Sequence, residues 1–245
     1  MTLAEILQSL LFADSGARLG SGLIAGLGHI GVGEPARGDG RIHVLGVVDS
    51  VELGVEQAIA LSGRVLHIAE IADDAPILML LDCRAQRKTR RDELLGLNEY
   101  LAHLAKALMV ADQVGHRTVG LLYGGASAGA LIATGLAASV LAALPDATPE
   151  VMDFASMARV TKLSIDAFRQ KTDSMVAFAP GLGNLVRIGG VCTVLRPEQP
   201  LASQIAAVLR CTGGSDERDR LGLQRQGRPK AASIAERVAA DIVNG

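Results

Sequence analysis

A long uncharged stretch, Thr118 to Leu144, constrains this chain more than any other feature. It begins with a short apolar run (Thr118–Leu122), passes through a turn of small residues (Gly124–Gly129) and continues as a helix-compatible run (Ala130–Ala138). This order predicts a buried strand, a tight turn and a helix. Unpaired backbone N–H groups at such a corner carry partial positive charge and can hold an anion.

Composition excludes several classes of function. The chain has 245 residues, enough for a full core, and 49% of them are apolar but only 2% are aromatic. Stacking on bases or sugars is therefore disfavoured, and the net charge of -2 argues against a nucleic-acid partner. The three cysteines lie far apart and the N-terminus lacks a basic segment, so we expect a cytoplasmic protein without disulfides.

A membrane span is the alternative interpretation of the uncharged stretch, since its length permits one. The Gly124-Gly125 pair would break a helix in mid-span, and no second apolar stretch of this length follows. A buried strand, turn and helix explain the same residues, so we expect no contact with a membrane.

Strands and helices alternate along the chain, which predicts one α/β domain over residues 1–245 with right-handed crossovers. Residues 1–40 are expected to be loop-rich after a short helix, and residues 213–230 to form an exposed loop. Residues 54–72 should form a helix whose buried face holds Val55, Ile59, Val65, Ile68 and Ile71. The other expected strands are 41–49, 76–82, 118–123 and 139–144, and the other expected helices are 92–114, 128–138, 201–211 and 231–243.

Gly26 to Gly31 matches a dinucleotide-binding G-x-G-x-x-G pattern in letters only. That pattern must leave a strand and open a helix, and the Gly- and Pro-containing residues that follow cannot open one. We therefore expect a loop here, with no nucleotide.

The turn at Gly125–Gly129 also reads G-x-S-x-G, the pattern of a serine nucleophile. Such a serine needs a base, and the five histidines all precede Ser127, which is the wrong order for an α/β-hydrolase. A patatin-type dyad needs a downstream Asp-Gly pair, whereas Asp39-Gly40 lies upstream. A patatin-like serine esterase thus remains an alternative, although the aspartate that would act as its base is not found at the expected place.

Two further interpretations of the turn need no nucleophile. Small residues can simply let a helix pack closely on a strand, as in a structural or regulatory subunit. Alternatively, the backbone N–H groups can form an oxyanion hole for a thioester enolate, such as the one left when a malonyl thioester loses carbon dioxide. Removing one donor of an oxyanion hole typically raises the barrier by about 3–4 kcal/mol.

From about Leu53 to Val191 the chain resembles the carboxyltransferase branch of the crotonase superfamily, and in particular the gamma subunits of malonate decarboxylase. The resemblance implies a ClpP/crotonase fold built from repeated ββα units. Its most specific segments are RRDELLG and MARVTK. The matching segments are Pro76–Asp82, Arg90–Gly96, Gly115–Arg117, Tyr123–Leu136, Ala143–Asp146 and Met157–Lys162.

The resemblance implies a lyase that works with a homologous beta subunit. Malonyl carried on the phosphopantetheine arm of an acyl carrier protein would be decarboxylated to acetyl, with no cofactor or metal bound directly by this chain. Two alternatives come with the family. The chain could belong to a carboxyltransferase that passes the carboxyl group to a biotin carrier, or it could be a non-catalytic subunit that completes its partner's pocket.

The resemblance also assigns site residues. The amides of Ala128 or Gly129 would polarise the thioester carbonyl, and Ser127 would shape the turn without attacking. Ala128 stands where the family usually has glycine, and an alanine still donates its N–H at negative φ. The expected catalytic positions are Ser127, Ala128 and Gly129. The expected substrate-binding positions are Gln86, Arg87, Gly124 and Gly125.

Overall fold

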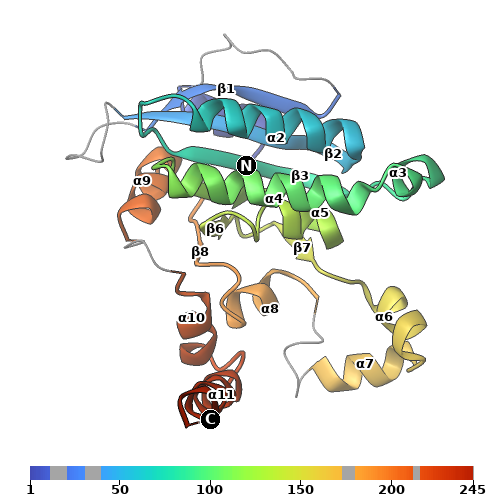
Figure 1. Ribbon diagram of the computed structural model, residues 1–245. Helices are drawn as coiled ribbons and strands as arrows, with labels where there is room; N and C mark the ends of the chain where they lie inside the picture. The colour runs from blue at the N-terminus through green and yellow to red at the C-terminus, as the bar shows by residue number, and fades with distance from the viewer. Residues whose placement is uncertain (12–20, 31–39, 173–179, 212–215, 245) are drawn as a thin grey trace.

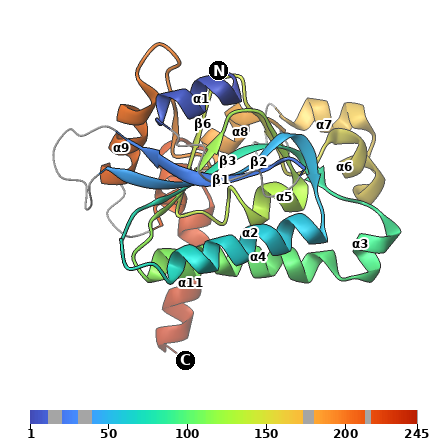
Figure 2. The same ribbon diagram turned by 90° about the horizontal axis from the view of Figure 1, so that it is seen from above.

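The computed structural model describes residues 1–11, 21–30, 40–172, 180–211 and 216–244 (Figure 1). In these ranges a mixed sheet lies between two layers of helices, as the view from above shows (Figure 2). No helix of the described residues is long and apolar enough to cross a membrane.

The main sheet has six strands in the order β1-β2-β3-β4-β6-β8. β1 runs antiparallel to β2, and all other neighbours are parallel. Strands buried on both faces read as continuous apolar runs, which is why β3 and β4 were predictable. The bounds are β1 (Leu23–His29), β2 (Arg41–Leu53), β3 (Ile77–Gln86), β4 (Thr118–Leu122), β6 (Val140–Ala143) and β8 (Thr193–Val194).

Alternate residues of the central strands enter two separate cores. Along β3, Met79 and Leu81 pack under α2 (Val55–Ala69), α4 (Leu97–Gln113) and α5 (Ala128–Ala133). Leu78 and Leu80 face the opposite core. That second core is covered by α1 (Leu3–Ser9) and α9 (Leu201–Cys211) (Figure 2). The period-2 alternation of a strand thus fixes both helix layers against one sheet.

The expected buried face of α2 is correct at Val55, Val65 and Ile68 and wrong at two positions. Ile59 is 48% exposed, and Ile71 is 37% exposed because it lies beyond the last turn of the helix. The helix packs against α4, and its small residue Ala58 faces inward where the larger Ile59 was expected.

The Gly124–Gly129 turn contains a short strand. β5 (Gly125–Ser127) pairs with β7 (Thr148–Glu150) in a separate two-stranded parallel sheet, and α5 starts at the next residue. The predicted order of strand, turn and helix is therefore confirmed, but the helix ends at Ala133 and not at residue 138. β3 also continues past Asp82, so Gln86 lies on the strand, four residues beyond the end expected at residue 82.

The expectation of a loop-rich N-terminal segment is wrong where β1 forms. Glycine is favoured at position 28 because a Cβ there would lie 3.1 Å from the carbonyl oxygen of Leu10, which is a tight contact. The G-x-G-x-x-G letters therefore fall largely on a strand and have no nucleotide-binding context, while Gly31 lies outside the described residues. The interspersed glycines hid the strand pattern in the sequence.

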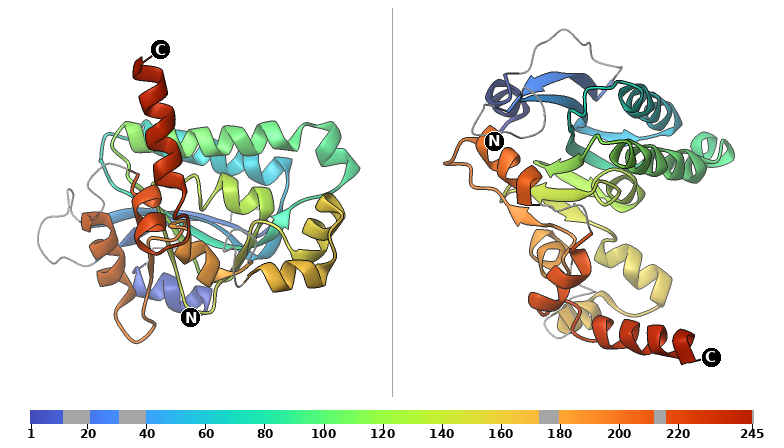
Figure 3. Two further views of the ribbon diagram at one scale, coloured as in Figure 1. Left: turned by 90° about the horizontal axis from the view of Figure 1, so that it is seen from below. Right: turned by 60° about the vertical axis from the view of Figure 1, so that its left-hand side comes forward.

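The C-terminal third adds helices outside the two core layers. The expected loop at 213–230 is wrong in part, because it contains α10 (Arg218–Gln224), which packs on α8. The terminal helix α11 projects away from the sheet (Figure 3). The remaining helices are α3 (Arg90–Leu94), α6 (Phe154–Thr161), α7 (Ile165–Thr172), α8 (Leu182–Arg187) and α11 (Ala231–Asn244).

Candidate active site

The corner between β5 and α5 lies beyond the carboxyl end of β4. Ser127 is the extended residue before the helix, and Ala128, the first helical residue, has a φ of 51°. The expectation that the Ala128 N–H serves as a donor was tied to a negative φ, and this condition is not met. Left-handed backbone strains a side chain by roughly 1–3 kcal/mol and is enriched at functional sites. The chain thus holds an alanine in the conformation that glycine adopts most easily.

Two amides of this corner already have side-chain acceptors. The Gly129 N–H donates to Gln86 Oε1 at 2.8 Å, and the Gly125 N–H donates to Asp82 Oδ1 at 3.1 Å. The Gly129 amide is therefore already occupied, whereas the oxyanion interpretation assumed that it is free. Ala128 has no side-chain acceptor for its N–H among the described residues.

Asp82 links the corner to the end of β2. Its carboxylate accepts hydrogen bonds from the Ser50 N–H at 3.2 Å and the Ser50 hydroxyl at 2.8 Å, in addition to the Gly125 N–H. A side chain on Gly124 would lie 2.3 Å from Asp82 Oδ1, so only glycine fits beside this carboxylate. The Gly124-Gly125 pair is thus explained by Asp82, which the sequence analysis treated only as the end of a strand.

A cleft of about 670 Å³ opens beside the corner. Gly125 and Ser127 line it, together with Arg84 and Glu150. Arg84 is exposed and supplies a positive charge at the rim. Gln86, Arg87, Ala128 and Gly129 are not among its lining residues. In the sequence Arg84 belongs to a basic cluster with Arg87, Lys88, Arg90 and Arg91, which fits either a seat for a carboxylate or phosphate or a solvated loop.

Arg87 lies elsewhere and has a structural role. Its guanidinium donates to Gln57 Oε1 at 3.0 Å and to Glu56 Oε2 at 3.4 Å, both on the first turn of α2. The carboxylate of Asp92 lies 3.9 Å away. Arg87 was expected to shape the wall facing the corner; in the structure its side chain joins the end of β3 to α2 and α3 and does not line the cleft.

Asp92 completes that junction from the start of α3. It is buried, accepts the Val55 N–H at 3.0 Å and is hydrogen-bonded to the Thr89 hydroxyl. Burial raises the pKa of the Asp92 carboxyl, but hydrogen bonds from Thr89 and Val55 and the charge of Arg87 outweigh it, so the pKa is lowered. Asp92 thus caps α2 from a distant part of the chain.

No side chain at the corner is equipped as a nucleophile. Burial raises the pKa of the Cys83 thiol to about 11, so it is neutral near pH 7. In the described part of the chain, no hydrogen bond joins the Ser127 hydroxyl to a histidine or a carboxylate. His43 and His116 lie at the amino ends of the parallel strands, whereas Ser127 follows a carboxyl end. The geometry therefore gives a serine esterase no base.

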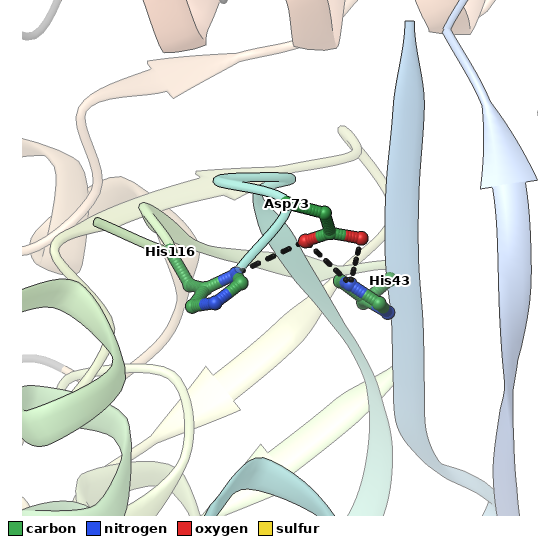
Figure 4. A group of neighbouring side chains, drawn as sticks. All are labelled: His43, Asp73 and His116. Carbon is green, nitrogen blue, oxygen red and sulfur yellow. Dashed lines mark hydrogen bonds and ion pairs between the residues drawn. The ribbon is translucent and has the colours of Figure 1, made fainter. Parts of the chain in front are cut away.

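We expected no metal site from the sequence, yet the fold brings three possible metal ligands together. His43, Asp73 and His116 place possible ligand atoms within 4.8 Å of one another (Figure 4). These residues are far apart in sequence, but each lies at or just before the start of a parallel strand. Neighbouring parallel strands bring their amino ends together, and that was the available signal.

Comparison with known families identifies the family of the chain. The family model described as "Malonate decarboxylase gamma subunit" matches residues 48–242, most of the chain. The chain belongs to the malonate decarboxylase gamma subunit family. The resemblance drawn from RRDELLG and MARVTK is thereby confirmed, as is the crotonase-like fold class.

Individual relatives of this gamma-subunit chain also belong to malonate decarboxylase and related carboxyltransferase systems. The malonyl-S-ACP:biotin-protein carboxyltransferase MADD of Malonomonas rubra is 27% identical over 167 residues, 62% of this chain and 57% of that protein. The chain thus spans little more than half of that relative. A solved Pseudomonas malonate decarboxylase hetero-tetramer in complex with coenzyme A gives a TM-score of 0.75, with 24% identity over 96% of this chain and 97% of the other.

A more distant solved structure extends the fold to carboxyltransferases. The hexameric transcarboxylase 12S with hydrolysed methylmalonyl-coenzyme A gives a TM-score of 0.60, with 17% identity over 78% of this chain and 36% of the other. At these identities, the structural matches establish the fold and nothing finer.

Proposed function

We propose that this chain is the gamma subunit of a malonate decarboxylase that converts malonyl-S-acyl carrier protein to acetyl-S-acyl carrier protein and carbon dioxide. Family membership supports the choice of reaction. The hydrogen bond from the Gly129 N–H to Gln86 Oε1 supports the choice of site, because an amide oxygen already occupies the position in which an oxyanion would be held.

The reaction makes a limited demand on the protein. When the carboxylate of a malonyl thioester leaves as carbon dioxide, the electrons of the broken C–C bond become an enolate, with negative charge on the thioester oxygen. Amides fixed by the fold stabilise that charge without reorganising. In our proposal the thioester oxygen replaces Gln86 Oε1 at the Gly129 amide and also meets the Ala128 amide. The carbanion carbon then takes up a proton to give acetyl.

The cleft suits an anionic, carrier-bound substrate. Arg84 stands at its rim, and a guanidinium pairs well with a carboxylate or a phosphate. We propose that the phosphopantetheine arm of the carrier protein enters past Arg84, so that the malonyl group reaches Gly125 and Ser127. The substrate then arrives on its carrier, and this chain holds no cofactor of its own.

A homologous beta subunit is part of the proposal. The solved Pseudomonas relative is a hetero-tetramer. The cleft of this chain is lined by the short β5–β7 sheet, by residues at the ends of β2 and β3 and by the start of α8, and its lining residues do not include Gly129. A partner seated against the corner would enclose both and exclude water from the enolate.

A biotin-dependent carboxyltransferase is the second candidate, because the Malonomonas relative is named as one. The same corner would stabilise the same enolate, and the carboxyl group would pass to a biotin carrier instead of leaving as carbon dioxide.

Reconstitution separates these candidates. The chain is co-expressed with its beta subunit, and the loss of malonyl from the carrier protein is followed with and without a biotin carrier. Our proposal predicts acetyl-carrier protein and carbon dioxide without biotin. An absolute need for the biotin carrier supports the second candidate. Full activity of the beta subunit alone would contradict both and leave this chain a structural role.

A further inference from the structure

His43, Asp73 and His116 form a largely buried cluster at the amino ends of the parallel strands (Figure 4). The Ser127 corner lies beyond the opposite, carboxyl ends of these strands. His43 lies on β2, Asp73 in the turn that leads from α2 to β3, and His116 in the turn that leads from α4 to β4. Their side chains are 8%, 12% and 2% exposed, respectively. The proposed decarboxylation uses none of the three.

The distances between the donor atoms of the cluster are close to those between the ligands of a small metal ion. His43 Nε2 lies 3.3 Å from both oxygens of Asp73, and His116 Nδ1 lies 3.7 Å from Asp73 Oδ1. Four ligands at about 2.1 Å from a tetrahedral zinc ion are about 3.4 Å apart. The three donor atoms therefore need only small movements to share one ion.

Both ring nitrogens of His116 face carbonyl oxygens. Its Nε2 lies 2.9 Å from the carbonyl oxygen of Ile71, and its Nδ1 lies 2.8 Å from the carbonyl oxygen of Ala75. A neutral imidazole has one N–H and can donate to only one of these oxygens. If Nε2–H donates to Ile71, the lone pair of Nδ1 faces the Ala75 oxygen and the Asp73 carboxylate, unless a cation lies between them.

That arrangement matches the outer shell of known metal sites. A histidine that binds a metal through one ring nitrogen almost always donates the other N–H to a carbonyl or carboxylate, which fixes the ring and its tautomer. The Ile71 oxygen performs this role for His116. On the other side of the cluster, Asp73 Oδ1 accepts the Ala75 N–H at 3.1 Å, which orients the carboxylate.

We propose that His43 Nε2, the Asp73 carboxylate and His116 Nδ1 bind a divalent transition-metal ion of the zinc class, with the Ala75 carbonyl oxygen or a water as the fourth ligand. Two imidazoles and one carboxylate favour zinc over calcium or magnesium, which prefer oxygen ligands. A cavity of about 170 Å³ reaches His43 and gives the ion a way in. Arg41, 3.9 Å from Asp73 Oδ2, is the nearest competing cation.

The ion would stabilise the fold and take no part in catalysis. It joins β2 to the turns that start β3 and β4, so it locks three neighbouring strands at one end of the sheet. A proton on His116 Nδ1 would satisfy the same oxygens without any metal. The experiment must therefore distinguish a bound metal ion from a protonated His116.

The test uses the full chain, purified with its beta subunit, stripped of metal by a chelator and then dialysed against zinc. We expect about one zinc ion per chain by mass spectrometry, as for a three-residue site with an open fourth position. Asp73→Asn and His43→Gln should lower zinc content at least about tenfold, and His103→Ala, which changes an exposed histidine on α4, should not. Zinc should raise the Tm of the wild type and of His103→Ala but not of Asp73→Asn.

Cobalt(II) provides a readout that does not depend on the variants. The wild-type protein should give the intense visible bands of tetrahedral cobalt, and zinc should abolish them. If the metal-free wild-type protein binds neither zinc nor cobalt(II) near pH 7, the proposal is overturned and a protonated His116 remains as the explanation. This outcome can be read from the wild type alone, even if both variants fail to fold. Equal zinc binding by wild type and Asp73→Asn overturns it as well.

Discussion

The backbone N–H of Gly129 donates a 2.8 Å hydrogen bond to the side-chain oxygen of Gln86. This bond joins the end of β3 to the first turn of α5, across 43 residues of sequence. The proposed oxyanion position is thus occupied by an oxygen of the protein itself. Because that oxygen sits on a side chain at a strand end, a thioester oxygen can replace it without unfolding the corner.

Replacing Gln86 with alanine tests this exchange. A neutral hydrogen bond contributes about 0.5–1.5 kcal/mol, and 1.4 kcal/mol corresponds to a tenfold change in affinity. Gln86→Ala should therefore lower the KM for malonyl-carrier protein by about two- to tenfold, with kcat little changed. Steady-state kinetics of the reconstituted complex measure both, with Gln113→Ala on α4 as the control. A large loss of kcat would instead make Gln86 a direct contributor to catalysis.

The left-handed backbone at Ala128 predicts an unusual effect of glycine. Ala128→Gly relieves strain of roughly 1–3 kcal/mol and adds an entropic cost of about 0.5–1 kcal/mol, so stability should rise or stay unchanged. Ala130→Gly, two residues further along α5, should lose about 1 kcal/mol. Urea unfolding of the two variants measures the contrast. An equal loss of stability in both would mean that Ala128 is not strained.

Gly124 should not tolerate a side chain. An alanine Cβ would lie 2.3 Å from Asp82 Oδ1, so Gly124→Ala must displace the carboxylate that holds Ser50 and Gly125. We expect a loss of about 1–3 kcal/mol. Gly63→Ala is the matched control, because a Cβ there meets nothing within 4 Å and alanine should add up to about 1 kcal/mol inside α2. Thermal unfolding that ranks the two variants in the opposite order would refute the contact.

Asp92 predicts part of the acid sensitivity of the fold. Its pKa is lowered in the folded chain, so the folded state binds fewer protons than the unfolded state as the pH falls. The stabilisation is present above the ordinary pKa of an aspartate, near 4, and disappears as the pH drops through the lower folded value. Asp92→Asn should flatten the pH dependence of the unfolding free energy below about pH 5, and the exposed Asp146→Asn should not. Identical pH profiles for wild type and Asp92→Asn would contradict the assigned role.

The sequence predicted the parts of the fold that depend on local pattern. The apolar runs of β3 and β4, the long helix α4 and the corner after β4 follow from hydrophobic periodicity and small residues. Gly26 and Gly28 concealed β1, because glycines in a strand remove the alternating pattern. Ile59 was wrongly expected on the buried face of α2, because α2 packs on α4 through its small residue Ala58. The size of the two residues does not reveal which of them faces α4.

The candidate site depended on contacts between distant residues, and here the sequence was less informative. The resemblance located Ser127, Ala128 and Gly129, but nothing local indicated the positive φ of Ala128 or the occupation of the Gly129 amide. Arg87 seemed free to bind a substrate because its partners, Glu56 and Gln57, lie about 30 residues earlier in the sequence, on α2.

The central claim is that backbone amides, and no side-chain nucleophile, carry the decarboxylation. The most direct test is the kcat of Ser127→Ala in the reconstituted complex with malonyl-carrier protein as substrate. Our account predicts a kcat within about tenfold of wild type, since the variant keeps every amide of the corner. A loss of about 10⁴-fold or more, as expected when an attacking serine is removed, would contradict it.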